Sequence, residues 1–268
     1  MRYAAPRSPR TPTPLLAALA CALAAPAANA ANAVPGGPPP LVVEIPETSG
    51  GGPLGAREGQ GSGFFVSPSG LIVTNGHVVA GCTEVEIAGH GVGKVLAVDQ
   101  SVDLATVQPE RADSVVPAEI AAGPLRLGQS VAVLGYPLAD LLGHSVSVTT
   151  GVVSTEVGLG GDRRQFTMTA SLEPGSSGGP VFDAKGRVVG VAASKMNAVA
   201  MILTTGSAGS NINFAVNADA LRTFLTRHAW SAPDATTTAA DLPMEDAVAM
   251  VRRSTVELTC RPPAVGEQ

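Results

Sequence analysis

Three side chains of this sequence could together hydrolyse an acyl bond: a serine, a histidine and an aspartate. Ser177 lies in the glycine-rich segment 175–180, between two apolar runs. A serine hydroxyl is a weak nucleophile unless an adjacent base takes its proton, and that base needs a group that orients it. His77 is the candidate base and Asp103 the candidate orienting group, and both precede the serine in that order. These residue types in this order predict nucleophilic catalysis, whereas segment 175–180 taken alone would describe an ordinary Gly/Ser turn.

The other histidines and a second aspartate have simpler explanations. The competing histidines lie in contexts that suit solvated or capping side chains: His90 in a glycine-rich hairpin, His144 in a loop and His228 at a helix end. Asp99 lies just before Asp103 and is expected to face solvent in a turn. Asp103 has apolar neighbours at the start of a strand, so its carboxylate would be partly buried and would need a partner, which His77 could supply.

The glycines around Ser177 indicate how negative charge on a substrate would be stabilised. Glycine lets the backbone turn sharply and approach a substrate closely. We expect the backbone N–H groups of Gly175 and Ser177 to form an oxyanion hole. Donors that point at charge developing in the transition state are worth about 3 kcal/mol each in comparable sites.

The composition favours a packed, strand-rich protein. Hydrophobic residues make up 45% of the 268 residues and aromatic residues only 3%, so the core must consist mainly of Val, Leu, Ile and Ala. Turn residues recur about every ten positions among residues of high β propensity. No segment has the length and period of a crossover helix, which disfavours a parallel sheet.

Two groups of strands are predicted in the globular part, after a short strand at 41–45. The first group comprises residues 62–66, 71–74, 84–87, 92–98 and 104–108. The second group comprises residues 130–135, 145–156, 165–170, 180–182, 188–195 and 213–216. Apolar residues at helical spacing predict helices over 218–229 and 242–253, and a strand over 255–260 follows. We expect this last strand to dock beside the first group.

The N-terminus has the features of a secretory signal over residues 1–30. A basic start precedes the apolar run 15–25, and Ala28-Asn29-Ala30 is a small-residue cleavage site. The apolar run is too short to span a bilayer, so we expect export to the periplasm or the medium without membrane insertion. Cleavage after Ala33 is equally permissible. Acylation at Cys21, which follows a triplet resembling a lipobox, is the less favoured option.

Charge and cysteine content restrict the partners of the chain. Removing the three arginines of the signal changes the net charge from −5 to −8. An acidic exported protein has no electrostatic footprint for nucleic acid. No Cys or His cluster has metal-ligand spacing, so we expect no metal and no cofactor.

Two alternatives stay open for Cys82 and Cys260, the cysteines that remain after the signal. Exported proteins can pair two cysteines, and a disulfide would bring the C-terminal strand to the segment that follows His77. The alternative is two buried free thiols, because spacing alone does not fix the geometry.

Several segments together resemble the Deg/HtrA branch of the trypsin-like serine proteases. These segments are residues 61–66 and 72–79 around His77, 99–105 around Asp103, 131–138 and 149–154 among the later strands, 173–182 around Ser177, and 213–216 before the closing helix. The chain order His, Asp, Ser is that of chymotrypsin-type proteases, whereas esterases of the α/β-hydrolase type place the serine first. The order and spacing of these motifs over about residues 58–228 make the likeness specific.

The resemblance implies an all-β fold of two six-stranded antiparallel β-barrels of the chymotrypsin type with a C-terminal helix. We expect barrel one at about 58–115 and barrel two at about 125–228, within a protease domain over 58–230. A Pro/Gly-rich linker, 31–57, would precede this domain, and an extension with a helix and a strand, 231–268, would follow it.

The resemblance also implies where the substrate pocket lies. Its walls would come from Ser171 and Leu172 on one side, and from Ala193 or residues 211–214 on the other. Ser171 stands where a trypsin-like enzyme would carry an aspartate that recognises Arg or Lys. We therefore expect small aliphatic side chains before the cleaved bond.

Departures from the family pattern concern regulation more than chemistry. Ser176 precedes the nucleophile where Asn is common, and Glu173 stands where an uncharged residue is usual. The sequence after residue 230 leaves no room for a PDZ domain, and the aromatic residues that relatives use to trimerise have no counterpart before Phe64. The resemblance predicts an exported serine endopeptidase that cleaves unfolded polypeptides through an acyl-enzyme. A non-catalytic protease-like scaffold that binds peptide strands is the alternative.

Overall fold

The computed structural model describes residues 59–195, 212–231 and 240–261. The predicted signal, linker and strand at 41–45 lie outside these residues, as does most of the loop predicted between the two C-terminal helices. The described residues fall in the unit formed by residues 51–268. Among them, no helix is both long enough and apolar enough to cross a membrane.

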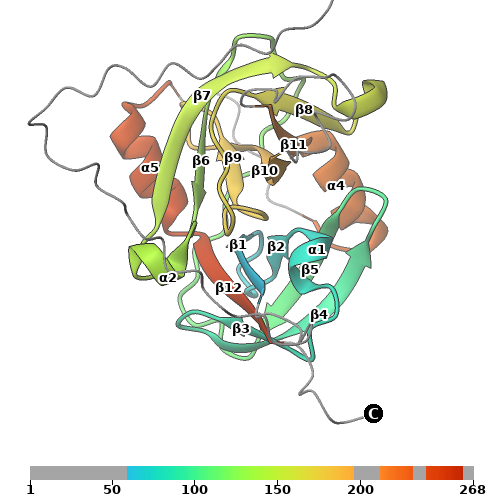
Figure 1. The fold of residues 1–268 in the computed structure, drawn as a ribbon, viewed down its shortest axis with the longest axis vertical. Coiled ribbons are helices and arrows are strands. Elements are labelled where there is room, and N and C mark those ends of the chain that lie inside the picture. The colour runs from blue at the N-terminus through green and yellow to red at the C-terminus, as the bar shows by residue number, and fades with distance from the viewer. Residues whose placement is uncertain (1–58, 196–211, 232–239, 262–268) are drawn as a thin grey trace, which may run out of the picture. The chain divides into compact units, whose positions relative to one another are not determined.

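One closed antiparallel barrel combines five strands from the first half of the chain with one strand from its C-terminal part (Figure 1). In order around the barrel, its strands are β1 (Gly59–Phe65), β12 (Thr255–Arg261), β3 (Glu84–Ile87), β4 (Gly91–Asp99), β5 (Leu104–Pro109) and β2 (Ile72–Thr74). Strand β3 shows the sequence pattern behind this fold, because Val85 and Ile87 alternate with glutamates and are the two buried residues. Strand β12 pairs with both β1 and β3, beside the first group of strands as expected.

The second closed barrel is formed by the later strands of the chain. In order around the barrel, these are β10 (Val188–Lys195), β11 (Asn213–Asn217), β8 (Gln165–Met168), β7 (Ser147–Thr155), β6 (Ser130–Gly135) and β9 (Pro180–Phe182). All pairings in both barrels are antiparallel. The predicted all-β fold of two six-stranded barrels is confirmed.

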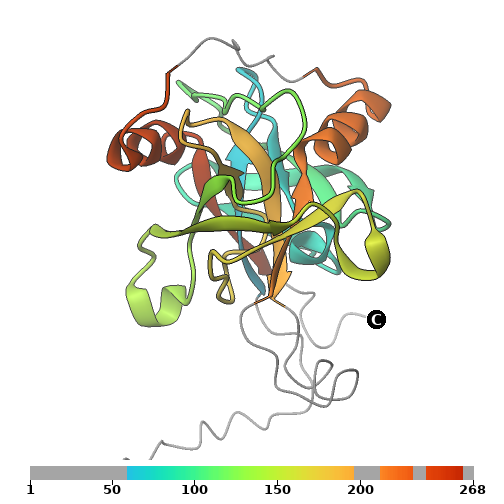
Figure 2. The ribbon, with the colours of Figure 1, turned by 90° about the horizontal axis from the view of Figure 1, so that it is seen from above.

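Two longer helices pack against the second barrel on opposite sides (Figures 1 and 2). They are α4 (Ala218–Arg227) and α5 (Met244–Arg252). Helix α4 begins where the side chain of Asn217 accepts a hydrogen bond from the N–H of Ala220. Helix α5 places Ala247 and Val251 on Ala132, Leu134 and Phe182 of the barrel. The short helical segments are α1 (Gly76–Val79), α2 (Ala139–Leu142) and η1 (Leu159–Gly161).

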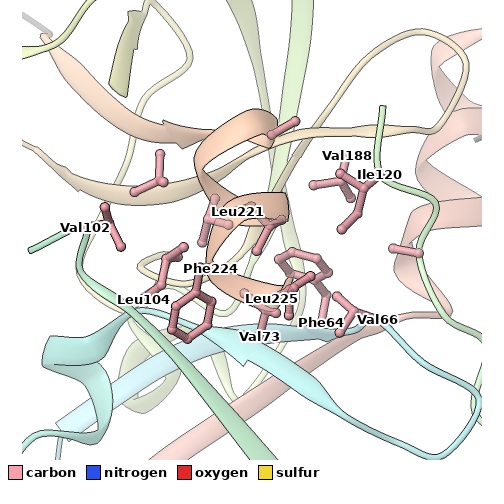
Figure 3. Close-up of a cluster of buried hydrophobic side chains, with 14 of the residues drawn as sticks. Phe64, Val66, Val73, Val102, Leu104, Ile120, Val188, Leu221, Phe224 and Leu225 are labelled. Atoms are coloured by element: carbon pink, nitrogen blue, oxygen red, sulfur yellow. The ribbon is translucent and has the colours of Figure 1, made fainter. Parts of the chain in front are cut away.

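A shared hydrophobic core joins the two barrels through α4 (Figure 3). Leu221, Phe224 and Leu225 of the helix are almost fully buried. They belong to one cluster with Phe64 of the first barrel and Val188 of the second, among others. Full burial of such a side chain contributes about 1.5–3 kcal/mol, so this core fixes how the barrels meet.

The structure joins Cys82 and Cys260 in a disulfide, with their Cα atoms 5.3 Å apart. Cys82 follows α1, and Cys260 belongs to β12, where it lies opposite Val85 of β3. The bond therefore ties the C-terminal strand to the segment after His77, and the alternative of two free thiols does not apply to this structure.

Candidate active site

Asp103 contacts His77 through both oxygens of its carboxylate. Oδ2 lies 2.7 Å from Nδ1 of the imidazole, and Oδ1 accepts a hydrogen bond of 2.9 Å from the backbone N–H of His77. Asp103 has a φ of 55°, a conformation that costs of order 1–3 kcal/mol when no other contacts hold it. The side chain of Asn75 donates to the Asp103 carbonyl oxygen at 2.8 Å and so helps to hold this conformation. The two contacts orient the imidazole with Nδ1 toward the carboxylate, which leaves Nε2 for a substrate-side proton.

The loop that carries Ser177 packs against the segment that carries His77. Gly178 has a φ of +85°, and a Cβ on it would overlap the Ser62 carbonyl oxygen and the Thr74 hydroxyl. The same Cβ would lie 3.0 Å from the backbone nitrogen of Asn75. Only glycine allows this approach, so the glycine after the serine brings the loop to the end of β2.

The hydroxyl of Ser177 is directed at the second barrel. It donates a hydrogen bond of 2.9 Å to the carbonyl oxygen of Ala193 in β10. Among the described residues, no hydrogen bond joins this hydroxyl to His77. Catalytic hydrogen bonds are often long or misaligned without substrate. Rotation about the Cα–Cβ bond of the half-buried Ser177 would redirect the hydroxyl.

Hydrogen bonds to backbone carbonyl groups fix the orientation of the peptide planes around Ser177. The Pro174 carbonyl accepts from the N–H of Leu138 at 3.0 Å, and the Ser176 carbonyl accepts from the N–H of Gly179 at 3.1 Å. A trans peptide directs its N–H away from its carbonyl. The N–H groups of Gly175 and Ser177 therefore point away from these partners, and neither donates a hydrogen bond within the described part of the chain. Such N–H groups are available to an anionic oxygen.

The three predicted pocket residues do not all line the same cavity. Ser171 lines a cavity of about 130 Å³ that also includes Leu138 and Glu173, but not Leu172 or Ala193. Leu172 and Ala193 are buried, and the N–H of Leu172 donates to the Asn213 side chain at 3.1 Å. Asn213 belongs to the expected second wall, whereas residue 211 lies outside the described residues.

The competing residues have partners of their own. Asp99 does not face solvent freely, because it accepts from Ser101 and pairs with Arg227 at 3.3 Å. The hydroxyl of Ser101 lowers the pKa of the Asp99 carboxyl. His144, expected in a solvated role, is exposed but contacts the buried Glu257 of β12 at 2.9 Å. Another cavity of about 520 Å³ includes none of the predicted site residues.

The structure adds residues that the sequence did not indicate. Ser62 contacts the loop of Ser177 through its N–H and through its hydroxyl. Leu138 holds the Pro174 carbonyl from the turn that opens α2. The only local signal was the pair of glycines that flank Ser62, because its partners in the loop of Ser177 lie more than a hundred residues further along the chain. In the described ranges, no group of three His, Cys, Asp or Glu side chains is placed to hold a metal ion.

Comparison with known proteins supports the class that this fold and site define. Residues 61–191 match the family model of the trypsin-like peptidase domain. An uncharacterized protein of Sinorhizobium fredii is 41% identical over 175 residues, which cover 64% of this chain and 28% of the relative. A protein of Hahella chejuensis named a probable periplasmic serine endoprotease, DegP-like, is 34% identical over 147 residues, which cover 51% and 30%.

Among solved structures, the crystal structure of the serine endoprotease from Yersinia pestis has the same fold. It matches with a TM-score of 0.50 and 23% identity over 62% of this chain and 56% of that chain. The chain thus contains a trypsin-like peptidase domain and is related to the serine proteases of the Deg/HtrA type. It spans less than a third of the length of the two curated relatives described above.

Proposed function

We propose that this protein is a serine endopeptidase that hydrolyses peptide bonds of polypeptides through an acyl-enzyme. The observation that carries the proposal is the double contact of Asp103 with His77, at 2.7 and 2.9 Å, beside the loop of Ser177. A carboxylate at Nδ1 fixes the tautomer in which Nε2 is free to take a proton and stabilises the imidazolium that results.

The reaction would proceed in two halves. In the first, the Ser177 hydroxyl turns from Ala193, its oxygen attacks the substrate carbonyl carbon, and its proton passes to Nε2 of His77. The N–H groups of Gly175 and Ser177 stabilise the resulting oxyanion. The C–N bond then breaks as His77 returns the proton to the leaving amine. In the second half, His77 takes a proton from water, the resulting hydroxide attacks the acyl carbon, and the Ser177 oxygen leaves with that proton.

A fluorophosphonate probe tests the chemistry directly, because it is captured only by an activated serine. We expect covalent capture at Ser177, loss of capture and of proteolysis in Ser177→Ala, and retention of both in Ser130→Ala, which changes an exposed serine at the start of β6. Thermal unfolding checks that each variant is folded. Activity of Ser177→Ala near that of the wild type would refute the assignment.

A non-catalytic scaffold that binds peptide strands is the second candidate. The observation in its favour is that the Ser177 hydroxyl donates its hydrogen bond to the Ala193 carbonyl and, within the described residues, none to the imidazole. A folded protein that binds peptides, captures no probe and cleaves nothing would support this candidate. Stoichiometric capture would exclude it.

We propose that the peptidase is exported and acts on unfolded polypeptides, as in protein quality control. The basic, apolar and small-residue pattern of residues 1–30 supports export, and so does the periplasmic location in the name of the relative from Hahella chejuensis. The disulfide is typical of an oxidising compartment. N-terminal sequencing of the exported protein should find a start at residue 31 or 34. A chain that begins at an acylated Cys21 would contradict cleavage after Ala30 or Ala33. Cleavage of one polypeptide faster in its unfolded than in its folded form tests the substrate class.

Substrate specificity is the remaining part of the proposal. Ser171, Leu172 and Ala193 would line the pocket for the residue before the cleaved bond. The pairing of the Leu172 N–H with Asn213 supports an arrangement in which both expected walls meet. A peptide library should be cleaved after small aliphatic residues, and preferred cleavage after Lys or Arg would contradict this expectation.

A further inference from the structure

Ser62 is a residue of the first barrel whose polar groups serve the loop of Ser177. It lies in β1 and is fully buried. Its backbone N–H donates to the Ser177 carbonyl oxygen at 2.8 Å, and its hydroxyl donates to the Gly175 carbonyl oxygen at 2.7 Å. One residue therefore holds the two carbonyl groups on either side of Ser176.

A third hydrogen bond fixes the direction of the Ser62 hydroxyl proton. The backbone N–H of Tyr136 donates to the Ser62 oxygen at 2.9 Å. Because an N–H group can only donate, the Ser62 oxygen accepts from Tyr136, and its own proton is free to bond the Gly175 carbonyl. The hydroxyl thus connects the end of β6 to the loop of Ser177.

The held carbonyl belongs to a residue that would otherwise have wide conformational freedom. Gly175 has a φ of +98°, a region that glycine enters without steric cost. Its own N–H is one of the two donors of the candidate oxyanion hole. Since Leu138 holds the peptide plane before Gly175 and Ser62 holds the plane after it, the direction of this N–H is fixed from both sides.

We propose that Ser62 is a positioning residue that sets the oxyanion hole of the peptidase, which makes this inference dependent on the proposed function. The space around the hydroxyl is tight, because a Cβ on Gly135 would lie 2.9 Å from the Ser62 oxygen and 3.0 Å from Cα of Ser176. A water has little room to replace the hydroxyl once it is removed. Loss of the hydroxyl leaves the Gly175 carbonyl without its partner and frees the peptide that follows it.

Ser62→Ala tests the proposal in the full-length protein with a peptide substrate and a peptide boronic acid. Full loss of one oxyanion donor costs 10²–10³ in kcat, so misplacement of a donor should lower kcat by about ten- to a hundredfold. We expect KM to change by less than about threefold, because the ground-state carbonyl uses these donors weakly. The boronic acid forms a tetrahedral adduct and should lose affinity by the same factor as kcat/KM.

Two controls separate positioning from a merely structural role. Ser62→Thr and Ser62→Val add the same bulk, but only threonine keeps the hydroxyl, so Thr should be at least about tenfold more active than Val if the oxyanion donor is what is lost. Ser254→Ala removes another buried hydroxyl, one that donates to Val251 in the C-terminal segment, and should leave kcat unchanged.

The outcomes decide between the proposals. Wild-type kcat in Ser62→Ala with an active, probe-labelled parent would overturn the role of Ser62 and leave the peptidase assignment intact. So would an equal loss in the Thr and Val variants, or a loss that appears in KM alone. A folded wild-type protein without proteolysis or labelling would overturn the peptidase assignment, and this inference with it.

Discussion

Removal of the disulfide between Cys82 and Cys260 should cost this protein much of its stability. The bond closes a loop with a sequence separation of 178 residues. The chain-entropy relation assigns about 5 kcal/mol to a loop of this length at 25 °C. Measured values fall below this relation when the unfolded chain keeps structure, so we expect the double variant Cys82→Ala/Cys260→Ala to lose about 3–5 kcal/mol.

The assay is reversible denaturation of the oxidised wild type, the double variant, and the wild type in reductant. Each kcal/mol shifts Tm by about 2–4 °C for a domain of this size, so Tm should fall by about 10 °C. The reductant should lower the wild type to the level of the variant and leave the variant unchanged. Strand β12 pairs with β1 and β3 without the bond, so the variant should still fold and cleave.

An unfolding free energy of the double variant within about 1 kcal/mol of that of the oxidised wild type would refute this role of the disulfide, because a cross-link over so long a loop must restrict the unfolded chain. Equal destabilisation of the variant and the wild type by reductant would refute it too. That result would mean that the reductant destabilises the protein by some route other than cleavage of the Cys82–Cys260 disulfide.

Three further predictions concern single side chains. Asp103→Asn should keep the fold but lower kcat by about ten-thousandfold, because His77 then adopts the wrong tautomer; equal kcat values would contradict the mechanism. Asp183→Ala should cost about 3 kcal/mol in urea denaturation, the low end for breaking a buried ion pair, since it removes a buried carboxylate that lies 2.6 Å from the partly buried Arg187 guanidinium. Burial, and then the charge of Glu257, raise the pKa of Tyr136 above its ordinary 10.0. The protonated Tyr136 phenol contributes its full stabilisation below pH 10, and this stabilisation is lost as the pH rises through the folded-state pKa. The unfolding free energy should therefore fall less at alkaline pH in Tyr136→Phe than in the wild type.

Local patterns were sufficient to predict most strands. Residues 84–87 alternate charged and apolar side chains, and the structure has β3 at those bounds. Residues 130–135 and 188–195 likewise form β6 and β10 as predicted. A strand pattern repeats every two residues and is visible within one segment. Helix α2 was missed because four residues are too few to show a helical period.

Long-range contacts around the site could not be read from such patterns. Ser62 and Gly175 are 113 residues apart, and nothing in either segment specifies the hydroxyl of one as the partner of the other. His144 and Glu257 are separated by the same number of residues, and their contact depends on where β12 lies in the first barrel. The Pro174 carbonyl accepts a hydrogen bond from Leu138 only because the turn before α2 packs against the loop of Ser177.

The sequence by itself determined the strands, the order of His77, Asp103 and Ser177, and the glycines that let the chain turn beside the serine. These features depend on residue type, local period and spacing. The sequence predicted that the last strand lies beside the first group, but only the tertiary structure decided that β12 lies between β1 and β3 and closes that barrel. It alone also decided that Ala193 receives the Ser177 hydroxyl and that Ser62 holds the Gly175 carbonyl. Those choices follow from the packing of two closed barrels on a shared core, because only closure fixes which distant backbone groups come within hydrogen-bond distance.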